Sequence, residues 1–292
     1  MTFNRRQALQ LAGAAAIGAT PLARALGQDK GKVPKVLFFT KSSGFEHSVI
    51  HRTGDKLAHA ERILTDLAKE HGFEIECSKD GRVFEPDKIG QYDLFAFETT
   101  GDLSKPGTDK APPISPEGEA AFYSAIKAGK GFVGFHCATD TFGSHRKQGK
   151  EDPYIAMIGG EFAGHGAQQV ATLKITDPSF PGAEPLGEAL TINDEWYALK
   201  NIAHDLHVIA AYETEGMKGK EYQRPNFPET WARLHGKGRV FYTSMGHRED
   251  VWENKMFHSL IIGGMFWALG KLDADVAPNI TKVTPGYMTM PA

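Results

Sequence analysis

The stretch GKGFVGFHCATD, residues 129–140, decides the fold. Residues 132–135 are aromatic, β-branched or glycine and carry no charge, which is typical of a strand buried on both faces of a parallel sheet. Polar side chains follow at once, where such a strand turns into a loop. Ligands of open α/β sheets bind beside this carboxyl edge of the strands. We therefore expect the functional site at this corner, which contributes His136, Cys137, Thr139 and Asp140.

The same stretch can also be interpreted as a core strand followed by an ordinary turn. In that interpretation His136 is satisfied by an internal hydrogen bond and Cys137 packs as a small hydrophobic side chain. Further stretches favour a site, because in each of them a predicted strand runs into a His, Asp or Glu. These stretches are residues 34–47, 93–102, 192–195 and 238–250.

Composition limits the function classes. The chain has 292 residues, of which 41% are hydrophobic and 24% charged, enough for one large α/β domain or two small ones. The formal net charge of −3 gives no electrostatic footprint for nucleic acid or anionic membranes. A small neutral or weakly acidic ligand is the better expectation. Cys77 and Cys137 are the only cysteines, so the chain can form at most one disulfide.

The N-terminus predicts export. Arg5 and Arg6 form a twin arginine, residues 9–19 are a short apolar run, and residues 23–25 read Ala-Arg-Ala, a cleavage signature. We interpret residues 1–25 as a twin-arginine signal peptide and residues 26–33 as a linker, which places the mature protein in the periplasm or outside the cell. The alternative is an N-terminal helix of the fold. No membrane span is expected in the mature chain.

Strands and helices alternate along the first half of the chain, which indicates crossover units and a parallel sheet. A helix with period 3.6 is predicted at 57–71, another begins at Ser115, and further helices are predicted at 153–158 and 255–269. The turn Gly236-Lys237-Gly238 predicts a pair of adjacent strands. Residues 271–292 read as an extended tail. Strands are predicted at 34–40, 73–77, 93–97, 132–135, 170–176, 208–212, 230–234 and 238–244.

The polar motifs together resemble the ThuA-like family, which is linked to trehalose utilisation. The resemblance covers residues 34–270 and depends on the order and spacing of seven motifs. They are Gly44-Phe45-x-His47, Thr99-Thr100-Gly101-Asp102, Gly134-x-His136-x-x-x-Asp140, Gly164-His165, Asp194-Glu195-Trp196-Tyr197, Gly238-Arg239-Val240-Phe241 and Gly246-His247. The resemblance implies an α/β fold like that of class I glutamine amidotransferases, a flavodoxin-like, mostly parallel sheet with helices on both faces.

The relation to amidotransferases sharpens the expected chemistry. Those enzymes present a cysteine nucleophile at a Gly-x-Cys elbow, whereas here His136 occupies the elbow tip and Cys137 lies one position beyond it. Residues 247–249 still resemble the amidotransferase His-x-Glu. A Cys-His thioester mechanism therefore lacks its nucleophile in register. The remaining imidazoles and carboxylates suit a divalent metal or general acid–base work.

The leading hypothesis is an exported enzyme that acts on a glycoside or keto-sugar, as the resemblance implies. His47, His136 and His247 would hold a divalent metal, with zinc the best match to imidazole ligands, and no nucleotide cofactor is expected. Asp140 and Glu249 would orient imidazoles. Catalytic roles fall to His136, Asp140, Glu195, His247 and Glu249. Substrate contacts fall to Gly44, Phe45, Thr99, Asp102, His165, Asp194, Trp196 and Tyr197.

Two alternatives stay open at the level of sequence. The acids and aromatics of residues 194–197 are a combination common where sugar rings stack, but they also fit a surface strand with a packed Trp. The alternative to an enzyme is a non-catalytic periplasmic sugar-binding or accessory protein on the same scaffold, because one scaffold hosts unrelated functions.

Overall fold

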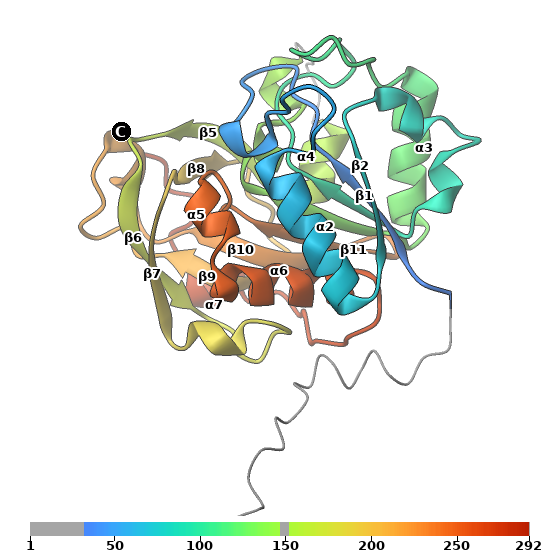
Figure 1. Cartoon of the computed structure of the whole chain (residues 1–292). Coiled ribbons are helices and arrows are strands. Elements are labelled where there is room, and N and C mark those ends of the chain that lie inside the picture. Colours follow the sequence, from blue (N-terminus) through green and yellow to red (C-terminus); the bar gives the residue numbers. More distant parts are fainter. Residues whose placement is uncertain (1–31, 147–151, 292) are drawn as a thin grey trace, which may run out of the picture. The chain divides into compact units, whose positions relative to one another are not determined.

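The computed structural model describes residues 32–146 and 152–291, and this part of the chain is built on a nine-stranded sheet (Figure 1). Its strand order is β2-β1-β3-β4-β11-β10-β9-β6-β7. The strands are β1 (Lys35–Phe39), β2 (Glu74–Ser78), β3 (Leu94–Phe97), β4 (Gly131–Phe135), β6 (Gln169–Ile175), β7 (Ala189–Asp194), β9 (His207–Tyr212), β10 (Pro228–His235) and β11 (Gly238–Thr243). The predicted signal peptide lies outside the described residues, as does the linker up to residue 31.

The first five strands of that order are mutually parallel, which confirms the predicted α/β class. Strand β4 lies between β3 and β11, with Phe97 and Tyr242 both opposite Gly134. Strand β1 lies between β2 and β3. Because all these strands run the same way, their carboxyl ends meet along one edge of the sheet, and the loops that follow them are brought together there.

The other half of the sheet is antiparallel, and the sequence predicted several of its strands but only one of its strand pairings. Strands β10 and β11 form the predicted hairpin, and β9, β6 and β7 add further antiparallel ladders. A separate two-stranded ribbon joins β5 (Glu161–His165) to β8 (Tyr197–Lys200). The sheet is therefore mixed, with one parallel and one antiparallel half.

Helices cover both faces of the parallel half. On one face Phe122 of α3 and Tyr154 of α4 pack on Phe132. On the other face Trp252 of α5 packs on Phe38 and Phe135, and Figure 1 shows α2, α5 and α6 in front of the sheet. The helices are α2 (His59–His71), α3 (Pro116–Lys127), α4 (Pro153–Ile158), α5 (Glu249–Trp252), α6 (Lys255–Ala268) and α7 (Ile280–Val283).

The helix ends follow their local sequence signals. The hydroxyl of Ser115 accepts a hydrogen bond from the Gly118 amide, and Pro116 occupies the first helical position of α3. Helix α2 ends at Gly72, whose φ of 77° closes the helix in the left-handed conformation. Among the described residues, no helix combines the length and apolarity needed to cross a membrane.

The segment after α6, expected to be an extended tail, packs on the domain. It contains the short helix α7, and Ile280 and Tyr287 are almost fully buried. The side chain of Asn279 exchanges hydrogen bonds with the backbone of Val208 in β9. Residues 271–291 therefore contribute to the core beside β9.

Candidate functional site

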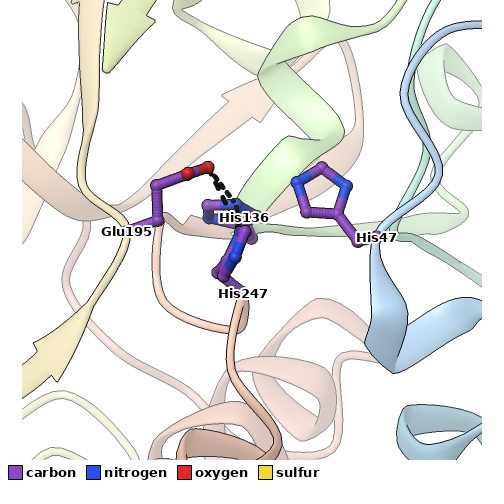
Figure 2. A group of neighbouring side chains, drawn as sticks. All are labelled: His47, His136, Glu195 and His247. Carbon is purple, nitrogen blue, oxygen red and sulfur yellow. Dashed lines mark hydrogen bonds and ion pairs between the residues drawn. The ribbon is translucent and has the colours of Figure 1, made fainter. Parts of the chain in front are cut away.

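Four buried or nearly buried side chains converge at the carboxyl edge of the parallel strands. They are His47, His136, Glu195 and His247, and each offers one ligand atom such that all four atoms lie within 4.8 Å of one another. Figure 2 shows these side chains pointing toward one another from four separate segments. The histidines follow β1, β4 and β11, while Glu195 lies between β7 and β8. The predicted meeting of the three histidines is confirmed, and Glu195 joins them.

His136 occupies a strained elbow directly after β4. Its φ is 36°, a left-handed conformation that non-glycine residues rarely adopt. Its Nδ1 lies 2.8 Å from the carbonyl oxygen of Ser244, so Nδ1 carries the proton and donates it. The lone pair of Nε2 is therefore free to face His247 and Glu195. The Tyr197 ring packs against the imidazole, with centroids 4.3 Å apart.

The spacing of the clustered atoms matches a metal coordination shell. His136 Nε2 and His247 Nδ1 are 3.2 Å apart, and these nitrogens lie 3.6 Å and 3.2 Å from Glu195 Oε2. Ligand atoms about 2.0–2.1 Å from a tetrahedral ion are about 3.3–3.4 Å from each other. The three atoms thus form a triangle of the size of one face of such a tetrahedron.

His47 lies across the group from Glu195, with His136 and His247 between them, as Figure 2 shows. Its ring centroid lies 5.0 Å from those of both His136 and His247. Only 2% of the residue is exposed, and its Nδ1 has no hydrogen-bond partner among the described residues. A buried imidazole nitrogen without a partner is costly, and an ion or a water would resolve it.

The electrostatics favour the protonation states that a metal requires. Burial, reinforced by the neighbouring imidazoles of His136 and His247, lowers the pKa of His47 to about 2, so this side chain stays neutral. Burial alone would raise the pKa of Glu195. The contacts with His136 and His247 outweigh it and hold the pKa of this carboxyl well below its ordinary value. Neutral imidazole and ionised carboxylate are the forms that bind metal ions.

Two fully buried carboxyl groups hold the loops that carry the clustered side chains. Asp194 accepts the amide of Glu195 at 2.9 Å on one oxygen and the amide of Gly246 at 2.8 Å on the other. It therefore ties the Glu195 loop to the His247 loop. Glu229 accepts the amides of Ser244 and Met245, and so fixes the carbonyl that orients His136.

Sequence reasoning assigned Asp194 to substrate contact, and its burial corrects that role to support of the backbone. Glu229 was missed. Its only signal in the sequence is that it is an acid directly before the predicted strand at 230–234.

Solvent-facing groups surround the cluster. His165 is half exposed, and its Nδ1 lies 3.2 Å from Glu195 Oε1, the oxygen not shared with His136 and His247. Phe45 is 68% exposed, and its ring meets that of His47 edge to face at 5.0 Å. Gly44 packs on Gly101 beneath this loop. A ligand that enters the site therefore meets an imidazole and an aromatic ring at its rim.

Several predicted roles need correction. Asp140 pairs with His145 at 2.8 Å, and Glu249 accepts a hydrogen bond from Ser48, so these acids orient none of the clustered imidazoles through a direct contact. Trp196 is fully buried and cannot stack on a sugar. Two further residues predicted to touch substrate serve the framework instead. Thr99 bonds Thr141, and Asp102 pairs with Arg146.

Both cysteines, Cys77 and Cys137, are free thiols, so the one disulfide that the sequence allows is not formed. Cys137 is fully buried, and burial, together with the nearby carboxylate of Glu98, raises the pKa of its thiol well above the ordinary value. An activated nucleophile requires the opposite shift. This environment agrees with the interpretation that Cys137 is not in register for thioester chemistry.

Comparison with known proteins supplies the family context. A family model described as ThuA, trehalose utilisation, matches residues 35–268. A ThuA-like protein of Bacteroides uniformis superposes with a TM-score of 0.61 at 17% identity, covering 82% of this chain and 94% of its own. One from Parabacteroides merdae gives the same TM-score and identity, covering 89% and 97%. At this identity the likeness shows the fold alone. A search of curated proteins found no match.

Proposed function

Because the chain belongs to the ThuA family, described as trehalose utilisation, we propose that it is a carbohydrate-processing enzyme whose reaction uses a divalent metal. The single observation that supports this proposal is the convergence of His47, His136, Glu195 and His247 within 4.8 Å. Three imidazoles and a carboxylate are donors that suit zinc, and related divalent ions share this preference. Bound there, an ion would polarise a sugar oxygen or activate a water molecule.

The chain's own groups supply the proton transfers. Glu195 is ionised and turns one oxygen toward the half-exposed His165. A glycoside or keto-sugar above the rim would place a hydroxyl, or the acidic proton beside its carbonyl, within reach of this pair. The exposed ring of Phe45 offers a face against which a sugar ring can pack. The reaction would then be a hydrolysis, an elimination or an isomerisation of the sugar.

The test measures metal and turnover together. Elemental analysis should find stoichiometric divalent metal in the wild type and a loss of it in His136→Ala, His247→Ala and Glu195→Gln. His51→Ala is the matched control, since His51 lies four residues after His47, pairs with Glu46 at the surface and takes no part in the cluster.

Turnover should be screened with disaccharides and their 3-keto forms, before and after a chelator. We expect the chelator to abolish product formation and added metal to restore it. Full turnover by demonstrably metal-free protein would remove the ion from the mechanism. Tight sugar binding with no product under any of these conditions would favour the alternative, a sugar-binding accessory protein.

We also propose that the protein is exported through the twin-arginine route. The paired arginines are a receptor-read address, so Arg5→Lys combined with Arg6→Lys should leave the precursor in the cytoplasm. Cell fractionation followed by immunoblotting checks this. Periplasmic delivery of the double variant at the wild-type level would contradict the twin-arginine route.

A further inference from the structure

The ring of His47 lacks the hydrogen-bonded support that holds His136. Metal-binding histidines usually donate their second ring nitrogen to an acceptor, which fixes the ring. His136 follows this rule, because the carbonyl oxygen of Ser244 holds its Nδ1. The Nδ1 of His47 has no hydrogen-bond partner among the described residues. The position of the His47 ring must therefore be set by packing and by the backbone of its own segment.

The segment that carries His47 alternates its side chains. The rings of Phe45 and His47 meet edge to face at 5.0 Å, so these two side chains lie on the same side of the chain. Glu46, between them, pairs instead with Lys79, which directly follows the edge strand β2. Neighbouring side chains of an extended chain point to opposite sides, and His47 has an extended backbone, with φ −72° and ψ 145°. An anchor on Glu46 therefore directs Phe45 and His47 to the other side, toward the site.

The ion pair between Lys79 and Glu46 is suited to act as this anchor. Lys79 Nζ lies 2.6 Å from Glu46 Oε1, and only 6% of Lys79 is exposed. Glu46 is the only acid within ion-pair distance of Lys79 among the described residues. The other oxygen of Glu46 lies 2.8 Å from His51 Nδ1, but 63% of the His51 side chain is exposed. Exposed pairs contribute little and breaking a buried pair is costly, so Lys79 supplies most of the hold on Glu46.

We propose that Lys79 is a positioning residue: through Glu46 it fixes the segment that presents His47 to the ion and Phe45 to the rim of the site. The inference rests on the proposed function, since it assumes an ion at the cluster. Lys79 contributes no atom to the cluster itself, so its effect on the ion is indirect.

The sign of the effect separates positioning from simple electrostatics. Lys79→Met removes a positive charge, and Coulomb's law alone would then strengthen the binding of a cation. We expect the opposite. The dissociation constant for zinc, measured by competition with a chromophoric chelator, should rise at least about tenfold, because the segment loses a hydrogen bond between charged groups. Glu46→Gln should also weaken zinc binding, and the double variant should stay close to the single ones, because both changes act on one contact.

Lys35→Met is the matched control. Lys35 pairs with Glu76 at 2.9 Å across the same two strands, but it begins β1, at the end of that strand opposite to the site. We expect this variant to keep the wild-type zinc affinity, even where thermal unfolding shows a loss of stability equal to that of Lys79→Met.

Hydrogen exchange of the metal-free proteins tests the positioning without the ion. Exchange of residues 43–51 should become faster in Lys79→Met and in Glu46→Gln, but not in Lys35→Met. If Lys79→Met does not fold, the exchange of Glu46→Gln decides, because Glu46 is partly exposed and glutamine keeps its shape.

The outcomes separate this inference from the proposed function. If the wild type binds neither zinc nor another divalent ion, the proposed function fails, and exchange of residues 43–51 alone decides whether Lys79 fixes the segment. If the wild type binds zinc, unchanged or tighter binding by Lys79→Met overturns the inference and leaves the proposed function standing. Fully additive losses in the double variant, or unchanged exchange in the segment, overturn it as well.

Discussion

Replacing Asp194 by asparagine should weaken the metal binding proposed above while leaving the fold intact. The fully buried carboxylate accepts the amides of Glu195 and Gly246, and so joins the two loops that carry Glu195 and His247. Asparagine has nearly the same shape but only one acceptor oxygen. Its NH₂ group must therefore face one of the two amides, and that amide loses its partner.

The size of the effect follows from one lost hydrogen bond to a charged group, worth about 1.5–3 kcal/mol. If the loops are misaligned by this change, the whole amount appears in the metal-binding free energy. The dissociation constant of the ion should then rise by about 10- to 150-fold. Any part of the loss that also destabilises the metal-free fold reduces this figure.

The assay is competition for the ion against a chromophoric chelator, with thermal unfolding measured on the same metal-free samples. Asp177→Asn is the control, because Asp177 also accepts a backbone amide and pairs with His207, but it lies beyond the opposite end of β6 from the cluster. We expect it to lower stability without changing metal affinity. Wild-type affinity in Asp194→Asn, or an equal loss of affinity in both variants, would refute the view that Asp194 positions the ligands.

Two further predictions concern other buried groups. Burial lowers the pKa of the fully buried Lys41 from 10.5 to about 8, although the nearby Asp109 opposes this shift. Because the unfolded chain then binds this proton more tightly than the folded one, the free energy of unfolding should rise with pH between about 8 and 10.5. Lys41→Met should abolish this rise, so the free energies of unfolding in urea for wild type and variant should diverge by up to about 3 kcal/mol between pH 8 and pH 10.5. Parallel pH profiles for the two proteins would contradict the lowered pKa of Lys41. Cys137→Ala should keep metal and turnover at a cost of about 1 kcal/mol in stability, whereas His136→Ala should lose both; an inactive but folded and metal-loaded Cys137→Ala would restore a role for the thiol.

The convergence of the three histidines could be predicted because it needs only a local pattern and one rule of topology. Each of His47, His136 and His247 follows a segment that reads as a buried strand, and parallel strands bring their carboxyl ends to one edge. Glu195 as a fourth member of the group could not be predicted in the same way. It lies after β7 in the antiparallel half, whose ladder partners are set by long-range packing rather than by a local signal.

The segment from Asp194 to Tyr197 shows where sequence pattern stops being informative. In an extended chain successive side chains point to opposite sides, so Asp194 and Trp196 share one side while Glu195 and Tyr197 share the other. The sequence contains this alternation but not the side that faces the site. In the structure Asp194 and Trp196 are fully buried, whereas Glu195 and Tyr197 contact His136. Only the packing of β7 and β8 against the sheet decides between the two sides.

The elbow itself explains why an amidotransferase-like scaffold would support different chemistry here. The backbone at residue 136 adopts a left-handed conformation, which turns that one side chain toward the loops at the sheet edge. His136 also begins a short 3₁₀ helix, His136–Asp140, and the side chain of the second residue of that helix, Cys137, is fully buried in the core. The tip therefore presents an imidazole whose free nitrogen meets His247 and Glu195, while the thiol one position later is held in its protonated form. A one-residue difference in register thus puts an imidazole at the tip of the elbow in place of a thiol, which is why the chemistry we propose uses a metal rather than a thioester.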